Sequence, residues 1–187
     1  MDADQFRRGA HRNGKTRDNS RMLRDKNLVP LSHQHHDALF LCVRIGRAHA
    51  AGDFDLSVWQ AEIQHKFQES ICGHFEAEEK VLFPEAGRYP ELRPLIQELI
   101  RDHDSLRGYF NRATAKSLDA DELLSFADKM SAHIRKEERE LFERCQQLMP
   151  PEELSRVGAA LDDALKHIPT ACAVPSPATR LRPRPKS

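Results

Sequence analysis

The hydrophobic residues between positions 30 and 168 recur every three or four residues, which is the spacing of amphipathic helices. The four long helices predicted from this spacing cover about residues 32–51, 57–83, 91–115 and 119–148. Ser32 is the expected N-cap of the first helix, and Pro84 and Pro150 are expected to end the second and the fourth. A short fifth helix ends near His167. This order predicts an all-α fold, an up-down-up-down four-helix bundle.

Each long helix has a stripe of residues that is expected to face the interior. In chain order the stripes are His36, Phe40 and Val43; Ile63, Phe67, Ile71, His74, Glu78 and Leu82; Leu92, Ile96, Leu99, His103, Leu106 and Phe110; and Leu123, Phe126, Met130, His133, Glu137 and Leu141. Histidine and glutamate therefore occupy positions where a bundle normally buries apolar side chains. These polar residues are the candidates for the chemistry of the protein.

The polar stripe residues belong to an internal repeat. Residues 74–83 and 133–142 both read H-x-x-x-E-E-x-x-L-F. Residues 35–39, His-His-Asp-Ala-Leu, match residues 102–106, Asp-His-Asp-Ser-Leu. The chain thus contains two copies of a helix pair. The first helix of each pair has one stripe histidine, and the second has a histidine and a glutamate four residues apart.

This spacing points to a metal site. Residues four apart share a helix face, so His74 with Glu78, and His133 with Glu137, are expected to point together into the bundle. Buried imidazoles and carboxylates are costly without partners, and two close carboxylates repel each other or take up protons. Two cations relieve both costs if each binds two histidines and the glutamates bridge them. A single pair at this spacing is usually a surface ion pair, but its duplication on apolar stripes favours metal binding.

The predicted metal ligands are His36, His74, Glu78, His103, His133 and Glu137. Mixed nitrogen and oxygen ligation favours iron, with manganese or zinc as competitors. Four protein ligands per metal leave positions for a bridging oxygen and for a small exogenous molecule. A ferritin-type site would instead show Glu-x-x-His spacing, which these positions lack.

The stretches 31–39 and 74–84 resemble the opening and the second-helix signature of the hemerythrin-like, or HHE cation-binding, family. The resemblance covers about residues 30–148 and implies a four-helix bundle around a non-haem, oxo- or hydroxo-bridged di-iron centre. It implies the same six ligands, with the two glutamates bridging. Oxygen-carrying members have a fifth histidine where this chain has Leu99. This departure leaves sensing, peroxide or nitric oxide chemistry and iron handling open as functions.

Residues beside the predicted ligands have two interpretations each. His35 lies about 100° from the ligand direction on the helix and is interpreted as an outer partner or an exposed residue. Glu79 and Glu138 follow the two bridging glutamates. They could accept hydrogen bonds from ligand N–H groups or simply be solvated.

Charge divides the 187 residues into three parts, although Lys+Arg and Asp+Glu both number 29. Residues 1–28 carry eight basic and four acidic residues and are predicted to be a disordered tail. Residues 169–187 carry four basic residues, no acidic residue and five prolines, also a tail composition. The predicted bundle domain, residues 29–168, is left with 17 basic and 25 acidic residues.

The four cysteines lack paired spacing such as C-x-x-C, and no apolar segment of the secretory type follows the basic N-terminal residues. No run of about 20 apolar residues is present that could span a membrane. A cytoplasmic protein with reduced thiols and no membrane partner is therefore expected.

The favoured hypothesis is a di-iron protein that binds or senses a small redox ligand, such as oxygen, nitric oxide or peroxide, or that handles iron. A metal- and oxygen-binding protein is favoured over a dedicated enzyme, and a monomer or small homo-oligomer is expected. One alternative is an enzyme that consumes peroxide or nitric oxide, and another is an interaction scaffold acting through the basic tails. The tails lack interleaved aromatic residues beyond Phe6, so specific nucleic-acid binding is not expected.

Overall fold

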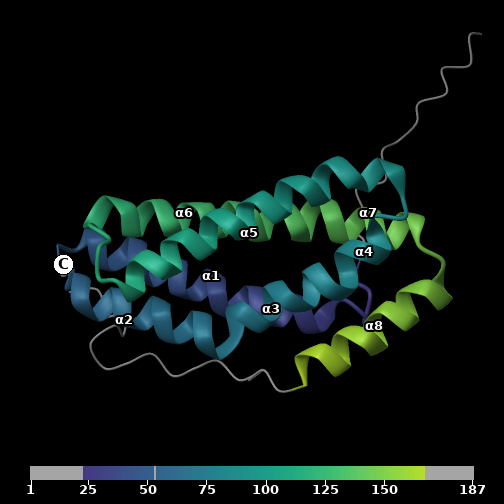
Figure 1. Ribbon diagram of the computed structural model, residues 1–187, viewed down its shortest axis with the longest axis horizontal. Coiled ribbons are helices and arrows are strands. Elements are labelled where there is room, and N and C mark those ends of the chain that lie inside the picture. The colour runs from purple at the N-terminus through teal and green to yellow at the C-terminus, as the bar shows by residue number, and fades with distance from the viewer. Residues whose placement is uncertain (1–22, 53, 167–187) are drawn as a thin grey trace, which may run out of the picture.

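A computed structural model describes residues 23–52 and 54–166, and within them every regular element is a helix. The elements are α1 (Val29–Ala50), α2 (Leu56–Lys66), η1 (Phe67–Ile71), α3 (Cys72–Ala77), η2 (Glu78–Leu82), α4 (Phe83–Ala86), η3 (Pro90–Leu92), α5 (Arg93–Thr114), α6 (Ala120–Lys136), η4 (Glu137–Leu141), α7 (Phe142–Leu148) and α8 (Pro151–Leu165). Figure 1 shows the long helical stretches side by side along the molecule. The prediction of an all-helical fold is confirmed. No helix in the described part of the chain is long and apolar enough to cross a membrane.

The second predicted helix is one helical stretch from Leu56 to Ala86, interrupted by the π-helical turns η1 and η2. The expectation that it ends at Pro84 is wrong. Pro84 falls in the first turn of α4, directly after η2. A π turn widens the helix, and the residue that follows it can lack an N–H donor, so the proline ring is accommodated here.

The first helix differs from its prediction in both its start and its buried face. It begins at Val29 with Leu28 as N-cap, and Ser32 lies inside the helix. Phe40 and Val43, which were expected to face inward, are 45 % and 46 % exposed. The buried side chains of α1 are Leu31, Gln34, His35, Ala38, Leu41, Cys42, Arg44 and Ile45. Residues 38–43 are all apolar, so hydrophobic spacing alone does not determine which side of α1 faces inward.

An arginine explains why that spacing was misleading. Arg44 is 3 % exposed, which a basic residue rarely is without a partner. Its guanidinium lies 3.0 Å from the Glu62 carboxylate and stacks over the Trp59 ring. Because this ion pair makes burial of Arg44 possible, α1 can turn the side containing Arg44 toward α2 and leave Phe40 outside.

The other predicted stripes face the interior. Every stripe residue of η3–α5 and of α6–η4 is at most 6 % exposed. In the α2–η2 stretch every stripe residue is buried except Phe67, which is partly buried. A capping box starts α6, in which the Asp119 carboxylate accepts a hydrogen bond from Glu122 N–H and the Glu122 carboxylate accepts one from Asp119 N–H. The short fifth helix, α8, packs against α1, α3 and η2.

Two apolar clusters fill the interior. The first joins the beginnings of α1 and α5 to η2, α4, η4, α7 and α8, and includes Leu31, Leu82, Leu99, Phe142 and Leu161. The second joins the later parts of α1 and α5 to α2, η1, α3 and α6, and includes Ile45, Ile63, Phe75, Phe110 and Phe126. Between these two sets along the long helices lie the buried residues His35, His74, Glu78, His103, His133 and Glu137. The polar residues are therefore held in the middle of the molecule with apolar side chains on both sides.

Residues 23–28 were assigned to the N-terminal tail from composition, and the structure describes them next to the bundle. Leu28 is completely buried in the first apolar cluster. The predictions for residues 1–22 and 169–187 lie outside the described residues, as does the end of the fifth helix at His167.

Candidate metal centre

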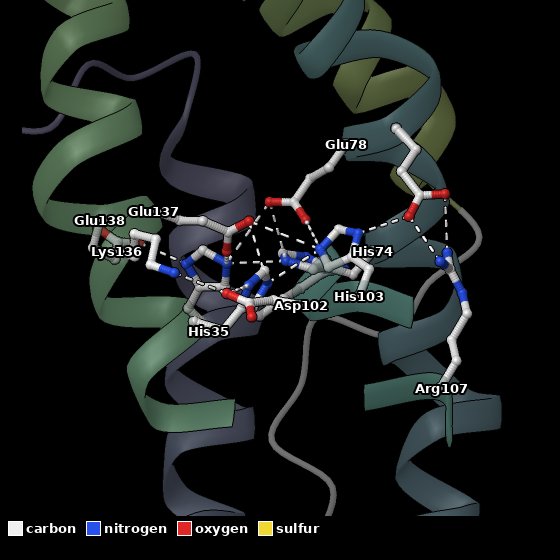
Figure 2. A network of polar contacts seen from close by, with 12 residues as sticks. His35, His74, Glu78, Asp102, His103, Arg107, Lys136, Glu137 and Glu138 are labelled. Carbon is white, nitrogen blue, oxygen red and sulfur yellow. Dashed lines mark hydrogen bonds and ion pairs between the residues drawn. The ribbon is translucent and has the colours of Figure 1, made fainter. Parts of the chain in front are cut away.

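Four histidines and two glutamates converge between the two apolar clusters (Figure 2). They are His35 from α1, His74 from α3, Glu78 from η2, His103 from α5, His133 from α6 and Glu137 from η4. Each of the six is at most 5 % exposed. They form two groups of four, one with His35 and His74 and one with His103 and His133, and both groups include the two glutamates. Within each group the candidate ligand atoms lie within 4.8 Å of one another, as expected for two neighbouring cation positions that share two carboxylates.

The structure brings five of the six predicted ligands together, but it places His36 elsewhere. His36 is exposed on α1, and the neighbouring His35 faces the cluster. His35 Nε2 lies 3.0 Å from His74 Nε2 and 3.1 Å from the Glu137 carboxylate. His36 was selected because its His-Asp-x-Leu pattern repeats at His103, yet the rotation of α1 is set by packing. The structure therefore places His35 in the cluster, and not the predicted His36.

A π-helical turn begins at each of the two shared glutamates. In η2 the Glu78 carbonyl accepts its hydrogen bond from Phe83 N–H, and in η4 the Glu137 carbonyl accepts from Phe142 N–H. Each bond spans five residues instead of the four of an α-helix, and such turns are frequent at functional sites. The repeated E-E-x-x-L-F was the available sequence signal for these turns, but helical periodicity alone did not reveal them.

The outer nitrogens of three histidines contact oxygen acceptors. Nδ1 of His35 lies 2.7 Å from the Glu138 carboxylate, and Nδ1 of His103 lies 2.7 Å from the Glu79 carboxylate. Nδ1 of His74 lies 2.8 Å from Gln34 Oε1. An oxygen acceptor requires a hydrogen on Nδ1, so the neutral form of each ring has its lone pair on Nε2, toward the cluster.

These contacts decide between the two interpretations of Glu79 and Glu138. Each accepts from a histidine of the other copy of the repeat, Glu138 from α1 and Glu79 from α5. Each carboxylate is in turn paired with an arginine, Arg24 at 2.8 Å from Glu138 and Arg107 at 2.9 Å from Glu79. Each half of the cluster therefore has its own arginine–glutamate–histidine chain. Chains of this kind orient metal-binding imidazoles.

The halves differ in the group behind the remaining histidine. Gln34, which faces His74, is neutral, whereas Asp102 faces His133, with its Oδ2 3.9 Å from His133 Nδ1. His133, Lys136 and Lys129 hold the pKa of the Asp102 carboxyl well below its usual range despite partial burial. The His133 side of the cluster is consequently backed by a permanent anion and the His74 side by an amide.

On the inner face of the cluster, the histidine nitrogens and the glutamate oxygens mainly face one another. The carboxylate oxygens of Glu78 and Glu137 are fully buried, and their shortest ion-pair contact is 3.1 Å, from Glu137 to His35 Nε2. The Nε2 atoms of His35 and His74 lie 3.0 Å apart, and those of His103 and His133 lie 3.1 Å apart. Lone pairs at such distances repel unless a proton or a metal ion lies between them.

Protons can partly offset this repulsion. Burial lowers the pKa of the His35 ring, but the hydrogen bonds and charges of Glu137 and Glu138 outweigh it and raise the pKa to about 9. Burial and the Glu137 charge raise the pKa of Glu78 well above its usual range. Burial lowers the pKa of His103 to about 4, so this ring stays neutral at neutral pH.

A family comparison agrees with this arrangement. The model of the hemerythrin HHE cation binding domain matches residues 27–145, which include all six residues of the cluster. The chain belongs to the hemerythrin HHE cation-binding family. Searches of curated proteins and of solved structures gave no significant match.

The residues of this HHE domain fit a pair of cations. Four buried carboxylate oxygens and four imidazoles facing one another offer mixed nitrogen and oxygen ligands in both groups. Leu99 is completely buried in the first apolar cluster, so its position supplies no fifth imidazole. Arg107, one turn after His103, is paired with Glu79 and does not reach inward as a ligand.

Proposed function

We propose that this HHE domain holds two iron ions in a four-helix bundle of alternating helix direction and binds or senses a small redox ligand. The observation that carries the proposal is the set of four buried carboxylate oxygens of Glu78 and Glu137, which face two pairs of opposed Nε2 atoms. The composition of the apolar clusters supports the bundle. The first apolar cluster joins the beginnings of α1 and α5 to α4 and α7, which end the helical stretches 56–86 and 120–148. Helices that alternate in direction bring such beginnings and ends together.

The residues would divide the work as follows. His35 and His74 would hold one ion and His103 and His133 the other, with Glu78 and Glu137 shared by both. Glu138 and Glu79 keep His35 and His103 in the orientation and tautomer that present Nε2. Two iron ions would supply redox capacity and positions not taken by protein ligands.

A small cavity adjoins the His35–His74 side and supports a small ligand. Its lining includes Ala38, Ile71, Phe75 and Met130 together with the edges of His35, His74 and His133. It has room for about one water-sized molecule. The mostly apolar lining and this size favour a diatomic or similarly small ligand such as oxygen, nitric oxide or peroxide over an organic substrate. An enzyme that consumes peroxide or nitric oxide would use the same residues, and steady-state turnover distinguishes it from a binding protein.

The decisive experiment is metal analysis with optical spectra of the oxidised and reduced protein after anaerobic loading with Fe(II). We expect two ions per chain in the wild-type protein. His35→Ala should lose one ion, whereas His36→Ala should keep both, because only His35 faces the shared carboxylates. Wild-type protein that retains no iron would overturn the proposed function. Loss of an ion in His36→Ala but not in His35→Ala would overturn the assignment on α1.

Metal affinity is expected to rise with pH. His35, with a pKa raised to about 9, is protonated at neutral pH and must lose this proton before Nε2 can bind a cation. Apparent affinity at the His35–His74 position should therefore increase by up to about tenfold per pH unit from roughly pH 6 to pH 9. Calorimetric titration with Zn²⁺ at pH 7 in buffers of different ionisation enthalpy measures the protons released. Binding without proton release would contradict this expectation.

A further inference from the structure

Arg24, which precedes α1, contacts the histidine cluster by two routes. Its guanidinium pairs with the Glu138 carboxylate at 2.8 Å and also donates to the Glu138 backbone carbonyl, and Glu138 accepts from His35 Nδ1. The same guanidinium lies 4.9 Å from the centre of the Phe142 ring. That ring stacks on the His35 imidazole, with centroids 5.6 Å apart and planes 12° from parallel. Arg24 therefore supports both the hydrogen-bonded edge of His35, through Glu138, and its face, through Phe142.

The other half of the cluster has an equivalent arginine on a helix. Arg107 of α5 pairs with Glu79, which accepts from His103 Nδ1, and its guanidinium lies 5.5 Å from the Phe75 ring. Phe75 stacks on His103 with centroids 3.8 Å apart. The two halves thus have the same arginine, glutamate and phenylalanine around one histidine. The difference is that α5 holds Arg107 in place, whereas Arg24 depends on the segment before α1.

Specific contacts hold residues 23–28 against the bundle. The Gln146 side chain of α7 accepts from Arg24 and from Asp25 N–H, and it donates to the Leu23 carbonyl. A Cβ atom at Gly158 of α8 would lie 2.5 Å from Asn27 Oδ1, so only glycine allows this approach of the segment to α8. The segment is therefore docked by one amide side chain and one glycine that lie outside the histidine cluster.

We propose that Arg24 is a positioning residue of the metal centre, and that attachment of residues 23–28 to α7 and α8 controls metal retention at the His35–His74 position. This inference rests on the proposed function, since it requires metal ions in the cluster. Detachment of the segment would remove the cation that holds Glu138 and one of the groups that cover Phe142. His35 would then lose the support for its orientation, while His103 would keep Glu79 and Arg107. The effect is expected at one metal position only.

Release of Fe(II) from the anaerobically loaded full-length chain to a colorimetric chelator tests the proposal. In Arg24→Ala, one of the two ions should leave roughly tenfold faster than in the wild type, at the lower end of the effect of losing an outer partner. Arg24→Lys should restore part of the difference because it keeps a cation near Glu138. Arg107→Ala should accelerate the other ion. In a His74→Ala background, Arg24→Ala should have no further effect, whereas Arg107→Ala should still accelerate release.

Two further variants detach the segment without touching Glu138. Gln146→Ala removes the side chain that holds the backbone of the segment, and Gly158→Ala displaces Asn27. Both should accelerate release of the same ion as Arg24→Ala, and they decide the question if Arg24→Ala does not fold. Arg88→Ala is the matched control, because this exposed arginine pairs with Glu85 away from the cluster.

The outcomes separate the two proposals. If the wild type binds no iron, the proposed function fails. If the wild type binds two ions and the segment variants release both at the wild-type rate, the positioning role of Arg24 fails while the metal centre stands. Equal acceleration of both ions, or loss of helical circular dichroism in all three segment variants, would show a general structural role and would also overturn the inference.

Discussion

Glu78→Gln is expected to remove both metal ions, because the Glu78 carboxylate belongs to both groups of candidate ligands. The amide has the size of the carboxylate but no charge, and its NH₂ group would face the buried imidazoles. The loss of affinity should exceed the roughly 10- to 100-fold typical of losing an outer hydrogen-bond partner. Metal content after Fe(II) loading and desalting measures the effect, with below one ion per chain expected, against one for His74→Ala.

Glu76→Gln is the matched control for this variant. Glu76 lies two residues earlier on the same helical stretch, but it is exposed and pairs with Lys80 at 2.7 Å. It should retain two ions. The metal-free Glu78→Gln protein should unfold at the same temperature as the wild type or a higher one, since a fully buried acid is costly. Retention of one tightly held ion in Glu78→Gln would show that the carboxylate is not shared.

Leu41→Ala is expected to lower the free energy of unfolding of the metal-free protein by about 2–5 kcal/mol, the range for removing a large aliphatic side chain from a core. Leu41 is 3 % exposed in the second apolar cluster. The adjacent Phe40 is 45 % exposed, and Arg44 lies over its ring. Phe40→Ala should therefore cost only about 1 kcal/mol or less. Urea denaturation followed by circular dichroism measures both values.

This pair of variants tests the rotation of α1 independently of any metal. The rotation that buries Leu41 also turns His35 inward and His36 outward. A larger loss of stability in Phe40→Ala than in Leu41→Ala would mean that α1 faces the bundle with the stripe of His36, Phe40 and Val43. The assignment of His35 to the cluster would then fail together with the assignment of Leu41 to the core.

The cluster also shows how the fold tolerates six buried polar groups before metal binds. A proton on His35 links the His74 ring and the Glu137 carboxylate, and the raised pKa of Glu78 favours its neutral form. Metal binding must displace protons of this kind, which couples the metal centre to pH. The carboxylates that are costly in the metal-free protein are the groups that both cations require.

The second helix of each repeated pair was the part that local geometry predicted best. Residues four apart on a helix share a face whatever surrounds the helix, so His74 with Glu78 and His133 with Glu137 could be paired from spacing alone. The stripe of α5, including His103, was also correct, because most of its apolar residues lie on one side of the helix. Repetition of both patterns was enough to predict a helical protein with a shared polar centre.

The sequence by itself determined the helices, the repeat and the spacing of His and Glu within each helix, since these depend on a fixed angle of about 100° per residue. Only the tertiary structure decided how far each helix is rotated about its own axis. On α1, with apolar residues throughout 38–43, that rotation came from packing and from the Arg44–Glu62 ion pair, and it exchanged His36 for His35. The contacts of Glu138, Glu79 and Arg24 join residues from different helices or from the segment before α1. Such contacts require the helices to be assembled, and no periodicity along a single helix contains them.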